Sequence, residues 1–102
     1  MYYIYFIHQY GDKFSVKIGM TKDLNKRLHD LQTGNPAELK YYRYFNISED
    51  KKICEQLEKL LHLKCKDKKI RGEWFYLSSD ELENLCIHIE EWLSKERKFM
   101  EI

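Results

Sequence analysis

Apolar and polar residues alternate over the first half of the chain in a pattern that predicts three strands. Residues 2–8 are dense in aromatic and β-branched side chains, and residues 14–20 resume this pattern after a turn over residues 9–13 that contains Gly11-Asp12. The short turn predicts that the first two strands form a hairpin. Residues 39–47 form the third predicted strand, which is rich in tyrosine and phenylalanine.

After the predicted hairpin, the spacing of apolar residues changes to the one typical of helices. Leu24, Leu28 and Leu31 have the i, i+4, i+7 spacing of one helix face. Thr21 or Asp23 is expected to cap this helix, and Gly34, followed by Asn35-Pro36, is expected to end it.

Two further helices are predicted in the second half of the chain. Ser48 is expected to cap the first, and Ser78 with Glu81 forms a capping box for the second, over residues 79–97. Their apolar faces are Ile53, Leu57, Leu60, Leu61 and Cys65 in one, and Leu82, Leu85, Cys86, Ile89, Trp92 and Leu93 in the other.

The segment between these helices is predicted to be a basic loop over residues 66–71, followed after Gly72 by a short strand over residues 73–77. Glu73-Trp74-Phe75 is expected to fix the C-terminal segment to the core, with Trp74 as its anchor. We therefore expect an α+β fold: a small three-stranded mixed or antiparallel sheet flanked by helices, with an extra C-terminal helix. Residues 1–102 would form a single domain whose core spans about residues 2–77.

Composition excludes few function classes. The formal net charge is +1, but residues 64–71 are mostly basic and residues 80–91 mostly acidic, so one face can still bind phosphate. The three cysteines show no CxxC spacing and are expected to be buried free thiols. The N-terminus does not resemble a signal peptide, and no apolar run is long enough to span a membrane, so we expect a cytoplasmic protein.

Glu58 and His62 lie one turn apart at the border of an apolar helix face. A carboxylate in such a position pairs with a cation or binds a metal, and a Glu-His pair at this spacing can bind a divalent ion. The alternative is that both side chains are simply solvated, as most helical glutamates are.

Three residues of the first strands and helix are candidates for phosphate chemistry. Arg27 could stabilise charge on a phosphate, and Tyr5 could accept a proton or orient water if nearby cations lowered its pKa. Lys17 could contact a phosphate or lower that pKa. The alternatives are a surface arginine, a core tyrosine and an exposed lysine.

Two groups of polar and basic residues could contact a nucleic-acid backbone, although each could equally be a solvated surface. They are Thr21, Lys22 and Lys26 at the start of the first helix, and Lys64, Lys66, Lys68, Lys69 and Arg71 in the basic segment.

The order of several short motifs resembles that of the GIY-YIG nuclease superfamily, most closely the branch named after a bacteriophage T5 open reading frame. The resemblance covers residues 2–77, and the combination of motifs carries it. The motifs are Tyr3-Ile4-Tyr5, Lys17-Ile18-Gly19-Met20-Thr21, Arg27-Leu28, Leu31-Gln32-Thr33-Gly34-Asn35-Pro36, Glu58, His62 and Gly72-Glu73-Trp74-Phe75.

The resemblance implies a one-metal phosphodiesterase that cleaves DNA, with RNA as the alternative substrate. Tyr5 matches the catalytic tyrosine, Arg27 the arginine that steadies the phosphate, and Glu58 the ligand of Mg²⁺ or Mn²⁺. Lys17 and His62 are the other two residues that we expect at this catalytic site. A cation that keeps several waters needs few protein ligands, so a single glutamate is chemically adequate.

The sequence departs from the superfamily pattern at several motifs. Tyr3 stands where glycine is usual, Lys17 where tyrosine is usual, and Leu31 where many members have histidine. Two other functions are therefore alternatives: a nucleic-acid-binding module that does not cleave, and a protein-interaction domain that uses the aromatic third strand. Site-specific relatives usually take their specificity from an attached DNA-binding domain, so we expect weak sequence preference, recognition of a nucleic-acid structure, or a protein partner. A homodimer would supply two sites for two strands.

Overall fold

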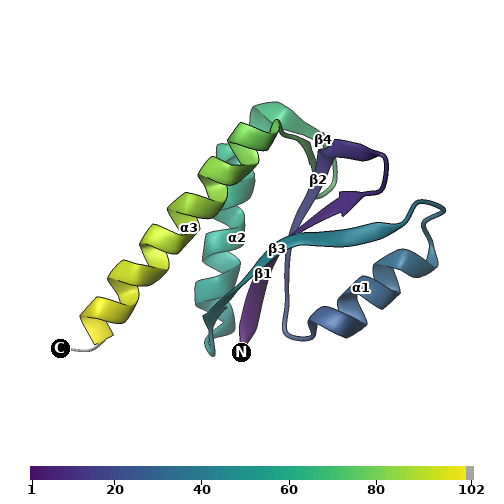
Figure 1. Cartoon of the computed structure of the whole chain (residues 1–102). Helices are drawn as coiled ribbons and strands as arrows, with labels where there is room; N and C mark the ends of the chain where they lie inside the picture. Colours follow the sequence, from purple (N-terminus) through teal and green to yellow (C-terminus); the bar gives the residue numbers. More distant parts are fainter. Residues whose placement is uncertain (101–102) are drawn as a thin grey trace.

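The computed structural model describes residues 1–100, with the side chains of Lys13 and residues 97–100 left undescribed. The elements follow one another as β1 (Tyr2–Gln9), β2 (Asp12–Thr21), α1 (Leu24–Thr33), β3 (Leu39–Ser48), α2 (Lys51–Lys64), the 3₁₀ turn η1 (Lys66–Lys68), β4 (Lys69–Arg71), β5 (Trp74–Tyr76) and α3 (Ser79–Met100) (Figure 1). The α+β class and the β1–β2 hairpin are confirmed.

The sheet has five strands in the order β3-β1-β2-β5-β4, and every pair is antiparallel. The prediction of a three-stranded sheet was therefore wrong. Residues 66–71, predicted to be a loop, contain η1 and β4 instead, and β4 pairs with β5. The error arose because a three-residue strand with two basic side chains carries no alternating apolar pattern, and its backbone pairing depends on β5 being present.

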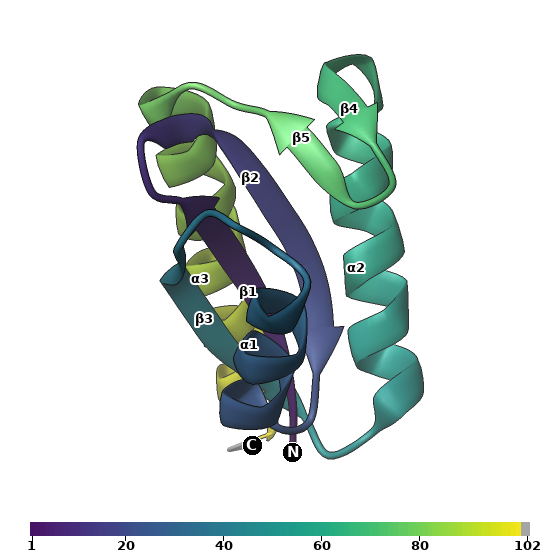
Figure 2. The same ribbon diagram turned by 90° about the vertical axis from the view of Figure 1, so that its right-hand side faces the viewer.

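The two faces of the sheet are covered differently. Helices α2 and α3 lie together on one face, and α1 lies alone on the other (Figure 1 and Figure 2). Alternation along β1 sends Ile4 and Phe6 into the large core beneath α2 and α3, and Tyr5 and Ile7 into a small core beneath α1. Phe75 belongs to the large core, whereas Trp74 packs in the small one, so the expected anchor role of Trp74 belongs to Phe75.

Helix caps agree with the sequence at two of three helices. Asp23 caps α1 by accepting from the Lys26 backbone N–H at 3.0 Å. The capping box at α3 is present, since Ser78 N–H donates to Glu81 at 3.0 Å and Glu81 N–H donates back at 3.1 Å. Helix α2 is capped by Asp50, whose side chain accepts from the Lys52 backbone N–H, and not by Ser48. The Ser48 hydroxyl instead accepts from the backbone N–H of Asp50, which precedes the helix.

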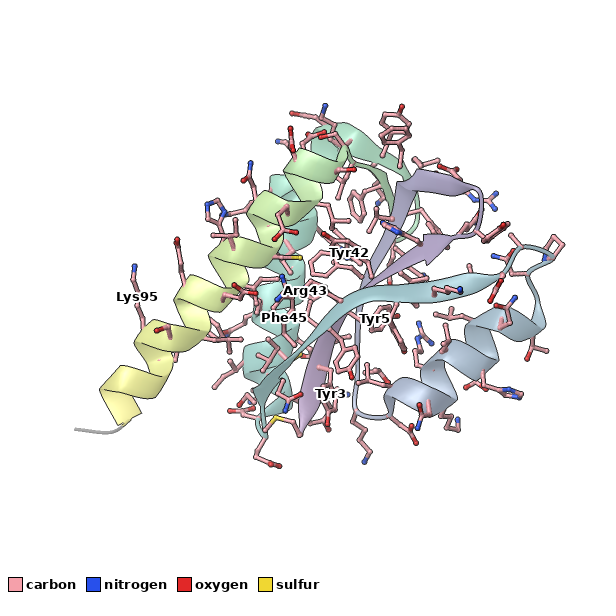
Figure 3. The ribbon with its side chains drawn as sticks, viewed as in Figure 1. Tyr3, Tyr5, Tyr42, Arg43, Phe45 and Lys95 are labelled. Atoms are coloured by element: carbon pink, nitrogen blue, oxygen red, sulfur yellow. The ribbon has the colours of Figure 1, made fainter. Side chains whose placement is uncertain are left out.

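Polar contacts fix α3 to β3. Arg43 forms ion pairs with Glu83 and Glu90, and the Tyr42 hydroxyl donates to Glu83 at 2.6 Å (Figure 3). That hydrogen bond to a carboxylate, followed by burial, raises the pKa of Tyr42 to about 12.

The three cysteines are buried free thiols, as expected, and burial raises the pKa of both Cys54 and Cys86 to about 11. None of the helices in the described part of the chain combines the length and the apolar composition that crossing a bilayer requires.

Candidate active site

Gly19 in β2 faces Tyr5 in β1 across the hairpin, on the side of the sheet that carries α1. A Cβ at residue 19 would lie 2.4 Å from the Tyr5 hydroxyl oxygen and 3.0 Å from Oε2 of Glu73. Real Cβ atoms do not approach other heavy atoms this closely, so glycine is required here. Its missing side chain leaves a notch in which the Tyr5 hydroxyl and the Glu73 carboxylate both lie.

Arg27 contacts Tyr5 directly. Its Nε donates a hydrogen bond to the Tyr5 hydroxyl oxygen at 3.1 Å. Because Asp23 begins α1 shortly before Arg27, the guanidinium projects from the first turns of the helix back onto the sheet. Tyr5 and Arg27, two residues singled out in the sequence, are thus brought together. Since the hydroxyl oxygen accepts from Arg27, its own hydrogen points elsewhere.

Tyr5 has no solvent-exposed surface. Burial raises its pKa above 10.0, and the hydrogen bond and positive charge of Arg27 only partly offset this effect. The condition that neighbouring cations lower the Tyr5 pKa is not met, because desolvation outweighs their effect. At neutral pH, Tyr5 is therefore a neutral phenol.

Lys17 and Glu73 form an ion pair beside the Gly19 notch. Lys17 Nζ lies 3.5 Å from Glu73 Oε2, and the lysine side chain is only 11% exposed. The lysine also lies 5.8 Å from the centre of the Trp74 ring. The alternative of a simply exposed Lys17 is therefore wrong. Its partner is Glu73, not Tyr5.

Glu73 is the residue at this site that sequence reasoning missed. Its Oε2 is buried and, among the described residues, has no hydrogen-bond partner. The Gly72-Glu73-Trp74-Phe75 motif was interpreted as structural only. The available sequence signal was a carboxylate placed directly before a short strand. When this strand, β5, pairs with β2, residue 73 comes to lie beside Ile18. The Ile18 backbone N–H donates to the Glu73 carbonyl oxygen at 3.0 Å.

Glu58, on α2, interacts electrostatically with both Glu73 and Tyr5. Burial raises the pKa of its carboxyl, and the negative charge of Glu73 raises it further. The Met20 backbone N–H and His62 act in the opposite direction. Glu58 is thus a half-buried carboxylate next to a second carboxylate, and its negative charge is incompletely compensated.

His62 lies one turn after Glu58 but makes a structural contact. Its Nε2 is 2.8 Å from the Ile18 carbonyl oxygen, and its ring packs 5.1 Å from that of Phe75. The carbonyl can only accept, so Nε2 carries the hydrogen. This bond fixes α2 to β2 next to Gly19, which makes His62 a residue that positions the site.

The residues present fit a divalent cation. A cation would stabilise the negative charges that Glu58 and Glu73 impose on each other, and the buried Glu73 oxygen offers an additional acceptor. Among the described side chains, no three His, Cys, Asp or Glu residues are grouped closely enough to hold a metal ion. A site with one or two carboxylates matches Mg²⁺ or Mn²⁺, which retain several waters, better than Zn²⁺.

The two groups of candidate nucleic-acid contacts lie on either side of the notch. Thr21, Lys22 and Lys26 adjoin the C-terminal end of β2, where they share a cavity of about 360 Å³ with Arg27. The second group spans the end of α2, η1 and β4, and β4 is joined to residues 15–17 of β2 through β5. Its members are Lys64, Lys66, Lys68, Lys69 and Arg71; all are exposed, and Lys68 pairs with Glu81 at 3.5 Å.

A family model of the T5orf172 domain matches residues 2–92, and the chain belongs to that family, which is a branch of the GIY-YIG-like nucleases. No curated protein and no solved structure matches the chain.

Proposed function

We propose that this chain is a metal-dependent endonuclease that hydrolyses phosphodiester bonds in DNA. The observation that carries the proposal is the gathering of Tyr5, Arg27 and Glu73 at Gly19, with Glu58 close enough to interact electrostatically with Tyr5 and Glu73. The four residues come from strand β1, helix α1, the turn before β5 and helix α2. Titratable groups with perturbed pKa values that meet in one place are typical of active sites. Membership of a nuclease family supports the same conclusion.

Tyr5 and Glu73 would handle the proton of the attacking water. A neutral phenol is a poor base, so Tyr5 would take a proton from water only as it gives its own proton to another group. Glu73 Oε2, across the Gly19 notch, is the available acceptor. The water oxygen bonds to phosphorus, its proton passes to Tyr5, and the phenolic proton passes to Glu73. The P–O bond to the leaving oxygen breaks, and that oxygen is protonated by solvent.

Arg27 would move during the reaction. Its guanidinium covers a hydroxyl that is otherwise fully buried. A phosphate that draws Arg27 away by a charge-assisted hydrogen bond would expose the hydroxyl to water. Arg27 would then stabilise the negative charge that develops on the phosphate oxygens.

Glu58 would hold the cation, with Glu73 beside it. A bound Mg²⁺ or Mn²⁺ supplies Lewis-acid stabilisation of the phosphate and leaving-group oxygens. Lys17, whose Nζ lies 3.5 Å from Glu73 Oε2, would hold the Glu73 carboxylate oriented towards the notch. His62 would hold α2, and with it Glu58, against β2.

DNA is the proposed substrate, with RNA as the alternative. The basic groups flanking the notch, Thr21 to Lys26 on one side and Lys64 to Arg71 on the other, could follow a strand across it. Specificity would come from a second copy of the chain, which would present two sites to two strands, or from a protein partner.

A nicking assay on supercoiled plasmid tests the proposal. Wild type should nick plasmid with Mg²⁺ or Mn²⁺ and not with EDTA, and Glu58→Ala should not nick under any condition. Glu55→Ala is the matched control, because Glu55 lies on α2 about one turn earlier and forms an ion pair with Lys51, whose Nζ is 3.7 Å from its carboxylate. Equal cleavage by wild type and Glu58→Ala would contradict the assignment.

A second candidate function is a nucleic-acid-binding module that does not cleave. The full burial of Tyr5 favours it, since a buried hydroxyl contacts no substrate unless Arg27 moves. Folded wild type that binds plasmid with strong salt dependence, but yields no product with either metal, would support this function instead.

A further inference from the structure

A row of tyrosines leads from the notch to the rim of the sheet. Tyr41 packs edge-on against Tyr5 with ring centroids 5.7 Å apart, and Tyr44 follows Tyr41 at 5.8 Å. Tyr3 packs edge-on against Tyr44 at 6.4 Å. Tyr3 and Tyr5 are both on the α1 side of β1 (Figure 3). Tyr3, Tyr41 and Tyr44 therefore form one continuous aromatic surface, which adjoins the buried ring of Tyr5 at the site.

This surface forms one wall of a cavity of about 360 Å³. Lys22, Asp23, Leu24 and Asn25, at the start of α1, form the opposite wall. A neighbouring cavity shares Lys22 and Asp23 with it and contains Arg27. The aromatic cavity is thus one step along the surface from the arginine proposed to hold the phosphate.

The wall is rigid where it meets the site and open at the rim. The Tyr41 hydroxyl donates to the Leu24 carbonyl oxygen at 2.6 Å, which fixes its ring between β3 and α1. Tyr44 is 53% exposed, although large aromatic side chains are usually buried. An exposed ring beside a lysine, next to a phosphate site, has the composition of surfaces on which bases of single strands stack.

We infer that this cavity, lined by Tyr3, Tyr41, Tyr44 and Lys22, binds an unpaired nucleobase of the strand whose phosphate lies at Arg27. The inference rests on the proposed function and narrows its substrate to DNA with unpaired nucleotides, such as a single strand, a flap or a bulge. A base within a duplex has both faces stacked and its edge paired, so it cannot enter. Lys22 neutralises the adjoining phosphate, and the Asn25 amide can bond the edge of the base.

Binding measured in EDTA tests this inference without cleavage. The probes are a fluorescein-labelled 12-nucleotide single strand and the duplex of the same sequence. Tyr44→Ala should weaken single-strand binding about 5- to 100-fold, the usual effect of losing one stacking contact, and leave duplex binding unchanged. Tyr44→Phe, which keeps the ring, should bind like wild type.

Tyr76→Ala is the matched control, since Tyr76 is 56% exposed and lies on β5, away from the cavity. It should bind both probes like wild type. Thermal unfolding of each variant separates a lost contact from a lost fold. The inference would be overturned if folded Tyr44→Ala bound the single strand as tightly as wild type does. An equal loss of affinity for both probes, or no binding of either probe by wild type, would also overturn it. Absence of nicking together with a single-strand defect in Tyr44→Ala would contradict only the nuclease function.

Discussion

The hydroxyl oxygen of Tyr5 lies 2.4 Å from the point that a Cβ of residue 19 would occupy, so the tyrosine and Gly19 fit together only because the glycine has no side chain. The backbone of Gly19 has an ordinary φ, so steric space rather than backbone conformation requires glycine. The Tyr5 hydroxyl of β1 therefore lies over the backbone of β2 at Gly19, and the Glu73 carboxylate lies beside it in the space that a side chain at residue 19 would fill.

Gly19→Ala should displace Tyr5 and abolish nicking. The methyl group would overlap a fully buried ring, and overpacking of this kind costs about 1–3 kcal/mol of unfolding free energy. Urea unfolding measures the loss of stability, and the plasmid assay measures the loss of activity. Gly34→Ala is the control: its φ is −100°, nothing lies within 4 Å of the added Cβ, and it should unfold like wild type. Equal stability of the two variants would contradict the close fit.

Arg27→Lys should reduce cleavage about 100-fold or more while retaining most DNA affinity. Lysine keeps the positive charge but cannot reproduce the Nε hydrogen bond to Tyr5 or a two-pronged bond to phosphate. Single-turnover cleavage, measured beside binding in EDTA, separates the two effects. Lys95→Arg, at an exposed position on α3, should leave both unchanged. Wild-type cleavage by Arg27→Lys would mean that charge alone suffices.

Glu73→Gln should slow cleavage about 100-fold without weakening DNA binding. The amide has the shape of the carboxylate but cannot accept the phenolic proton, and its neutrality removes a repulsion towards phosphate. The measurement is kcat beside the dissociation constant for DNA in EDTA. Glu38→Gln, an exposed glutamate paired with Lys40 at 3.8 Å, serves as the control. An unchanged kcat for Glu73→Gln would remove Glu73 from the proton path.

The sequence predicted those parts of the fold that local chemistry decides. The hairpin, the leucine face of α1 and the Ser78–Glu81 capping box all depend on residues close together in the chain. Strand β4 could not be predicted because its three residues gain stability only by pairing with β5. Both Ser48 and Asp50 are residue types that cap helices, so residue propensity alone does not show at which of them α2 begins.

The site was only partly predictable for a similar reason. The motif order identified Tyr5, Arg27 and Glu58, but the state of Tyr5 depends on tertiary burial, which raises its pKa where nearby cations alone would lower it. Glu73 became visible only when β5 paired with β2 and brought its carboxylate to the notch beside Gly19. Both effects depend on contacts between residues that are far apart in the sequence.

Glu58→Gln should stabilise the metal-free protein at neutral pH. The folded-state pKa of Glu58 is raised, so the folded protein binds a proton that the unfolded chain has released, and stability falls as pH rises from the ordinary carboxyl value through the raised one. Above this pH range the folded protein carries the unfavourable charge of the Glu58 carboxylate, and glutamine removes that charge. The Tm of Glu58→Gln at pH 7 in EDTA should therefore exceed that of wild type, and this gain should vanish near pH 4.

The same variant separates metal binding from catalysis. Saturating Mn²⁺ should raise the Tm of wild type, because a ligand that binds only the folded state stabilises it, and should leave Glu58→Gln unchanged. Glu55→Gln should respond to Mn²⁺ as wild type does. A Tm increase of equal size in Glu58→Gln would place the cation elsewhere.

His62→Ala should loosen α2 from β2 and thereby weaken the site at a distance. Loss of the bond to the Ile18 carbonyl leaves a partly buried acceptor unpaired, which costs about 1–3 kcal/mol, and Glu58 loses its fixed position. Urea unfolding and the Mn²⁺-induced rise in Tm should both decrease. His62→Gln, whose amide can donate to the same carbonyl, should recover part of each, and His29→Ala, an exposed change on α1, should alter neither. Full catalytic loss in His62→Ala with an unchanged Mn²⁺ response would instead indicate that His62 takes part in the chemistry directly.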